Sequence, residues 1–206
     1  MIKRDTIIKY LIETYSPDAI IVYGSFVDGS ANEHSDFDAL VIANSSKKHD
    51  SSVIEDIPLD VFIYPPEVFQ DEYNPEDFIQ VFDGEIVLDK KGIAKSLKER
   101  VLEFTKGRTL KTNEEIQNEV YWLKKMLMRT SRGDTEGYYR WHWLLYDSLE
   151  IYFNIKRLRY CGPNKALRTL HKIDPEAYSI YLLALKEFTQ ETLSGWIDYL
   201  EDLSLV

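Results

Sequence analysis

Hydrophobic and polar positions follow two different periods along the 206-residue chain. In the first ninety residues, short apolar runs are separated by polar turns, a pattern typical of strands. An amphipathic helix is expected first, over about residues 4–15, because the apolar positions there recur at helical spacing. Strands are expected at about 20–23, 36–42, 57–64 and 85–88, a loop at 44–52, and short helices at 66–73 and 76–81.

From about residue 90 the strand signals stop and apolar residues recur with the helical period. Thr112 and Glu115 form a capping-box pattern, which satisfies the free amides at a helix start. Gly162 followed by Pro163 predicts the end of a long helix, because glycine tolerates left-handed geometry and proline cannot continue a helix. Helices are expected at about 93–106, 112–132, 138–160, 164–172, 175–190 and 193–203.

These two periods predict an α+β fold made of two domains. Residues 1–92 would form a mixed β-sheet flanked by helices. Residues 93–206 would form a C-terminal α-helical bundle.

The chain carries a formal net charge of −10. Proteins that bind nucleic acid usually present a basic surface, so no nucleic-acid partner is expected, and a small cationic partner suits this charge better. No apolar run is long enough to span a membrane and no secretion signal precedes the first helix, so no membrane partner is expected. The single cysteine, Cys161, fits a reducing compartment, and a cytoplasmic location is expected.

Acidic residues on two of the expected strands indicate a site with its own chemistry. Asp36 and Asp38 are two apart on a strand, so their side chains share one face, and two neighbouring carboxylates repel unless a cation lies between them. Asp60 interrupts a later apolar strand, where an unpaired carboxylate would be costly. Together with the turn Gly24-Ser25, the three acids predict a divalent-metal site that handles phosphates.

Each of these features also has a plain structural interpretation. A Gly-Ser turn occurs wherever a chain reverses tightly, and an Asp-x-Asp pair fits a solvated edge strand or a helix start. The combination, at this spacing and with Asp60 on a strand, favours the metal site, provided that the residues lie on strands as expected.

The motif resembles that of the nucleotidyltransferase superfamily, which includes DNA polymerase β and the antibiotic-modifying nucleotidyltransferases. The family pattern is a strand ending in Gly-Ser, about ten intervening residues, Asp-x-Asp, and a later strand aspartate. This chain supplies each part without departure: Gly24, Ser25, the pair Ser35-Asp36, Asp38 and Asp60. The helical half looks like the helical domains of the aminoglycoside and lincosamide nucleotidyltransferases, an architectural analogy without a motif.

The resemblance implies a transfer of a nucleoside monophosphate, AMP from ATP or the corresponding group from another nucleotide triphosphate, with release of pyrophosphate. Two Mg²⁺ ions would be held by Asp36, Asp38 and Asp60, with Asp60 also a candidate acceptor of the proton from the attacking hydroxyl. Gly24, Ser25 and Ser35 would bind the nucleotide. The expected acceptor is a hydroxylated, cationic small molecule of the aminoglycoside or lincosamide type, so that the protein would belong to the antibiotic-resistance enzymes.

Several residues and alternatives remain open from the sequence. Another carboxylate could be the base, and Lys165 could reach a phosphate. The acceptor could instead be a protein, as in small antitoxin-like nucleotidyltransferases, or the chain could be a silent nucleotide-binding module. Some relatives build the acceptor site across a homodimer. The candidate bases are Glu85, Asp89, Asp147 and Glu150.

Aromatic residues and histidines add less. Aromatic side chains gather on the helix expected at 138–160, and Tyr139 and Trp143 lie on a different side from Trp141, so the cluster could be core or line a ligand site. His34 is expected in a solvated loop near the Asp pair, and His49 in a polar loop.

Overall fold

The computed structural model describes residues 2–46, 48–107 and 110–205. The chain divides into two compact units, Met1–Arg108 and Thr109–Val206, each with its own hydrophobic core. In the described ranges, the structure contains no helix with both the length and the apolar character needed to cross a membrane.

A mixed β-sheet forms the centre of the first unit, as predicted. Its strands lie in the order β3-β5-β2-β1-β6, and β4 pairs with β5. The β2–β5 pair is parallel, and the other pairs are antiparallel. The strands are β1 (Ala19–Tyr23), β2 (Phe37–Ile42), β3 (Lys48–Asp50), β4 (Val53–Ile54), β5 (Ile57–Tyr64) and β6 (Glu85–Asp89).

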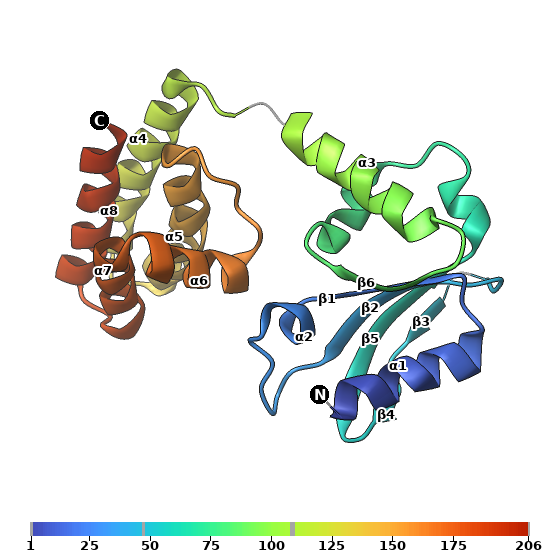
Figure 1. Cartoon of the computed structure of the whole chain (residues 1–206). Coiled ribbons are helices and arrows are strands. Elements are labelled where there is room, and N and C mark those ends of the chain that lie inside the picture. The colour runs from blue at the N-terminus through green and yellow to red at the C-terminus, as the bar shows by residue number, and fades with distance from the viewer. Residues whose placement is uncertain (1, 47, 108–109, 206) are drawn as a thin grey trace. The chain divides into compact units, whose positions relative to one another are not determined.

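Helices cover both faces of this sheet (Figure 1). Helix α1 (Ile2–Tyr15) packs on the face that carries Ile20 and Val22. Helix α3 (Ile93–Gly107) packs on the opposite face, which carries Ile21 and Tyr23. The second face is also covered by two 3₁₀ helices, η1 (Pro66–Phe69) and η2 (Pro75–Val81). Because β1 is covered on both sides, all its residues are buried, which explains its continuous apolar run.

The loop expected at 44–52 is wrong for residues 48–50, which form the edge strand β3 on β5. Lys48 and His49 are exposed there, so the strand has no apolar face of its own, while Asp50 is buried. The Tyr15 hydroxyl donates to Asp50 Oδ2 at 2.6 Å and the Tyr10 hydroxyl at 3.2 Å. These bonds tie the edge strand to α1.

The second unit is a bundle of helices, which confirms the predicted helical C-terminal half. The capping box of Thr112 and Glu115 is present at its start. A single core joins the helices, with Trp196 and Tyr152 among its largest fully buried side chains. The helices are α4 (Asn113–Thr130), α5 (Thr135–Ile155), α6 (Pro163–Ile173), α7 (Pro175–Lys186) and α8 (Gln190–Ser204).

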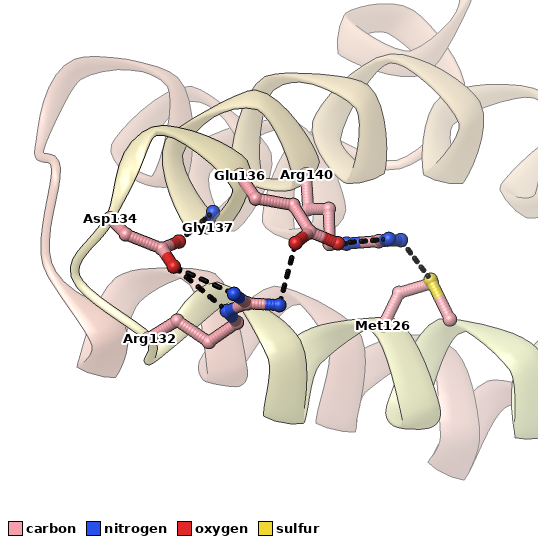
Figure 2. A network of polar contacts seen from close by, with 6 residues as sticks. All are labelled: Met126, Arg132, Asp134, Glu136, Gly137 and Arg140. Carbon is pink, nitrogen blue, oxygen red and sulfur yellow. Dashed lines mark hydrogen bonds and ion pairs between the residues drawn. The ribbon is translucent and has the colours of Figure 1, made fainter.

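Helix α5 begins three residues earlier than the predicted 138, because Asp134 caps it by accepting a hydrogen bond from the Gly137 amide at 2.8 Å. Figure 2 shows the network of ion pairs and hydrogen bonds around the start of α5. Arg132 bonds both Asp134 and Glu136, and Arg140 bonds the other oxygen of Glu136. This network links residues of the turn between α4 and α5 to the first turns of α5.

Helix α5 also ends earlier than the predicted residue 160. Its last residue is Ile155, and Arg157 follows with a left-handed φ of 56°. The prediction that Gly162 and Pro163 end a helix is wrong, because they begin α6 instead. Gly162 is the N-cap with φ 82°, and Pro163 occupies the first turn, where its missing N–H costs nothing.

Helix α3 connects the two halves in sequence and packs within the first unit, on η2 and β6. These residues were predicted to belong to the second domain, residues 93–206. The division into functional domains at residue 92 stays a prediction.

We expect Asp50→Ala to lower the free energy of unfolding by about 1–3 kcal/mol, because two tyrosine hydroxyls lose their shared acceptor. Burial opposes ionisation of Asp50, but hydrogen bonds from Ser52, Tyr15 and Tyr10 prevail and hold its pKa below the usual range. The stabilisation is therefore present at neutral pH and is lost as the pH falls through that lowered pKa. Urea unfolding at several pH values measures it, with the exposed Asp71→Ala as control. Equal losses in both variants at neutral pH would contradict this role.

Candidate metal centre

Strand register brings Asp36, Asp38 and Asp60 together. Asp38 on β2 is the direct partner of Asp60 on the parallel strand β5, and residues in register share a face. Asp36 comes just before β2 and points to the same side as Asp38. Each residue offers a carboxylate oxygen, and the three oxygens lie within 4.8 Å of one another. The acids gather at one end of the sheet.

The charge of this cluster is felt by the neighbouring strand. Tyr23 on β1 is in register with Asp38, and its ring is almost fully buried. Burial raises the pKa of the Tyr23 hydroxyl, and the negative charges of Asp38 and Asp60 raise it further. Tyr23 therefore stays neutral at physiological pH, and the cluster remains a concentration of negative charge that suits a cation.

Gly24 is needed for a physical reason at this position. Its φ is +70°, a conformation that L side chains rarely adopt. A Cβ added there would lie 2.2 Å from Asp38 Oδ2, far inside contact distance. The glycine thus leaves the space that the Asp38 carboxylate occupies.

Ser25 follows Gly24 and carries an unused polar group. Its Oγ is buried and has no hydrogen-bond partner among the described residues, so this hydroxyl remains able to bond a ligand. Ser35 is differently placed, because its Oγ accepts a hydrogen bond from the Asn32 amide at 2.9 Å and helps to form the turn before β2. Both serines line one surface pocket of about 660 Å³.

The donor set fits a hard divalent cation. Mg²⁺ prefers oxygen ligands and is usually bound through one or two carboxylates together with phosphate oxygens. The cluster supplies three carboxylates, two of them half-buried and one exposed, so its outer side is open to further ligands.

His49 was not among the residues predicted for this site. It was expected in a polar loop, but it lies on β3 with its Nε2 2.6 Å from Asp60 Oδ1. The ring rests on Phe62, with centroids 4.7 Å apart. Lys48, His49 and Asp50 are all polar, so no local pattern marks them as a strand and no sequence signal could have found His49.

Two candidate bases of the first unit lie away from the three aspartates. Glu85 is in register with Val22, whose side chain points to the α1 face, and it pairs with Arg4 of α1 at 2.7 Å. Asp89 is in register with Ala19 at the opposite end of β1, where it accepts a hydrogen bond from the Lys95 amide at 3.0 Å. Neither is brought to the cluster.

The other candidate bases lie in the helical unit, on a surface pocket of about 490 Å³ formed by α4 and α5. Glu119 in this pocket is paired with Lys111. Burial raises the pKa of Asp147, and the charge of Glu150 raises it further, so these two acids repel each other. Trp122 also lines the pocket.

The other candidate residues of the helical unit are the aromatic side chains of α5 and Lys165. Trp141 is core and stacks on Phe188, whereas Tyr139 and Trp143 are exposed, as their positions on the helix predicted. Trp143 packs edge-on against Trp122. Lys165 lies on α6, within the helical unit.

The family model described as a nucleotidyltransferase domain matches residues 4–125, more than half of the chain and all three aspartates. No curated protein matches the chain.

Two solved structures are similar at low identity. A nucleotidyltransferase-like protein from Exiguobacterium sibiricum is 17% identical, with 98% of this chain and 73% of that chain covered and a TM-score of 0.38. Spectinomycin adenyltransferase AAD(9) from Enterococcus faecialis, solved with ATP and spectinomycin, is 12% identical, with 99% and 98% covered and a TM-score of 0.41. With scores and identities this low, neither structure carries an inference about substrate.

We expect Gly24→Ala to weaken Mn²⁺ binding by about 10–100-fold, because the added Cβ displaces the Asp38 carboxylate. Gly29→Ala is the matched control: its φ is also left-handed, at +79°, but nothing lies within 4 Å of the added Cβ. That control should show only the backbone strain, about 1–2 kcal/mol of stability. Isothermal titration calorimetry with Mn²⁺ measures the affinity of each variant and of the unmodified protein. Equal Mn²⁺ affinity in both variants would contradict the assignment.

Proposed function

The chain belongs to the nucleotidyltransferase domain family, and from that premise we propose that it transfers AMP from ATP onto a hydroxyl of a small molecule and releases pyrophosphate. The observation that carries the proposal is the meeting of Asp36, Asp38 and Asp60 within 4.8 Å beside Gly24. Such a cluster has no evident structural use, since the three acids repel one another.

The three aspartates would divide the work by position. Asp38 on β2 and Asp36 just before it would hold the metal together with the triphosphate. Asp60, from the neighbouring strand, would complete the metal site on the side of the acceptor hydroxyl and is the candidate acceptor of its proton. Bound Mg²⁺, two ions in this proposal, supplies charge neutralisation for the attacking and leaving oxygens.

The turn at Gly24 and Ser25 would hold the outer phosphates. The unpartnered Ser25 Oγ can donate to a phosphate oxygen, which would supply the partner that this buried atom lacks. Gly24 supports the same arrangement, because its lack of a side chain leaves room for the Asp38 carboxylate beside the turn. Ser35 would act through the turn that it holds with Asn32 rather than by direct contact.

We propose a cationic, hydroxylated acceptor, of the kind represented by aminoglycosides. The acidic pocket on α4 and α5 supports this class, because Asp147 and Glu150 repel each other and an amine would relieve that repulsion. Trp122 in the same pocket offers an apolar surface. The net charge of −10 would concentrate such a cation near the protein.

The first test is pyrophosphate release from ATP and Mg²⁺ with a panel of aminoglycosides and lincosamides. We expect release that depends on one acceptor class and falls by about 10³-fold or more in Asp38→Asn, since metal clamping contributes several kcal/mol to the barrier. Asp71→Asn, an exposed acid of the same unit, should keep full activity.

Each other outcome has a meaning. Near-normal activity of Asp38→Asn would refute the metal assignment. ATP binding without release for any small acceptor would favour a protein acceptor, or a nucleotide-binding module without catalysis.

The second test is the acceptor KM of Asp147→Asn. We expect it to rise by about 10–100-fold, the cost of losing a hydrogen bond between charged groups, with kcat little changed. Because its pKa is raised, Asp147 takes up a proton at a higher pH than an ordinary aspartate, so the acceptor KM of the unmodified protein should rise as the pH falls. Asp198→Asn, exposed on α8, is the control. Unchanged KM values in both variants would remove this pocket from the proposal.

A further inference from the structure

We propose that His49 is a positioning residue of the metal centre. Its Nε2–H would hold Asp60 by one oxygen, so that the carboxylate keeps the orientation in which it binds a cation. This rests on the proposed function, in which Asp60 is a metal ligand.

The strand register sets the pair up. His49 on β3 is the direct antiparallel partner of Phe62 on β5, and Asp60 is two residues from Phe62 on the same face. The His49 ring lies on the Phe62 ring, 4.7 Å between centroids at an interplanar angle of 32°. The Phe62 ring therefore supports one face of the His49 imidazole, and His49 Nε2 lies 2.6 Å from Asp60 Oδ1.

The chemistry of the pair fixes which group donates. An ionised carboxylate can only accept hydrogen bonds, so the hydrogen of this contact lies on His49 Nε2. An imidazole Nε2–H can make this bond in either charge state of the ring, so His49 orients Asp60 by donating one hydrogen bond.

The rest of β3 is anchored on its other side. The neighbouring residue Asp50 is buried and held by the hydroxyls of Tyr15 and Tyr10. The Lys48 ammonium lies over the Tyr15 ring, 4.4 Å from its centroid. These contacts hold the backbone of His49 in place without using any residue of the aspartate cluster.

If the pair served only to stabilise the fold, loss of the imidazole would lower the free energy of unfolding and leave metal binding unchanged. The side chains of His49 and Asp60 are 45% and 40% exposed, and exposed pairs add little to stability, about 0–1 kcal/mol. Loss of the imidazole should therefore leave folding nearly unchanged. Its effect should appear in metal binding, where partners that orient a ligand are worth about 10–100-fold in affinity.

The test is calorimetric titration of the full-length protein with Mn²⁺, without nucleotide, in four variants. His49→Ala should weaken Mn²⁺ binding about 10–100-fold, and His49→Gln should recover most of it, because the glutamine amide can donate from a similar position. His34→Ala is the matched control, an exposed histidine in the loop before β2, and should bind Mn²⁺ like the unmodified protein. Asp38→Asn should lose binding.

Three results would overturn the inference. Normal Mn²⁺ affinity in His49→Ala, with binding lost in Asp38→Asn, would refute the role of His49 and leave the proposed function standing. Equal weakening in His49→Gln and His49→Ala would show that hydrogen-bond donation is not what matters. Normal binding in Asp38→Asn would refute the metal assignment itself, and with it both proposals.

Discussion

The parallel pairing of β2 with β5 is the constraint on which the candidate site depends. It sets Asp38 beside Asp60 at a strand spacing that only backbone hydrogen bonds can enforce against the repulsion of two carboxylates. A slip of one residue would turn every side chain of β5 to the other face and remove Asp60 from the cluster. The burial of Leu59, Val61 and Ile63 of β5 on the α1 face opposes such a slip.

One strand of the same sheet, β3, carries both a residue that anchors the fold and a residue that contacts the candidate site. Asp50 and His49 are neighbours on β3, yet one points into the protein and the other lies beside Asp60. Alternation along one short strand thus gives an anchor and a contact at the site in consecutive residues. The helical unit has its own core, and its acidic pocket is lined by residues of α4 and α5 together with Lys111.

The sequence was sufficient for the fold class and for the placement of Asp36 and Asp38 on one face, because both depend on local patterns, whereas the approach of Asp60 depends also on the pairing of β2 with β5. Apolar runs marked the central strands, and the spacing of Asp36 and Asp38 placed them on one face. It failed for β3, whose residues are polar because it is an edge strand with an open side. His49 was missed for the same reason, since its place beside Asp60 follows from a strand pairing that no local pattern announces. Gly162 and Pro163 were misread because either residue can stand at the start or beyond the end of a helix.

The hydrogen bond on Asp60 Oδ1 has a consequence for ion selectivity. A carboxylate with one oxygen already engaged offers a cation a single oxygen, and this favours one-point coordination. Ca²⁺ accepts six to eight oxygens and often takes both from one carboxylate, whereas Mg²⁺ requires a compact octahedron of single contacts. Under the proposed role of His49, the imidazole therefore biases the centre toward the smaller ion, by limiting how Asp60 can bind rather than by changing the size of the site.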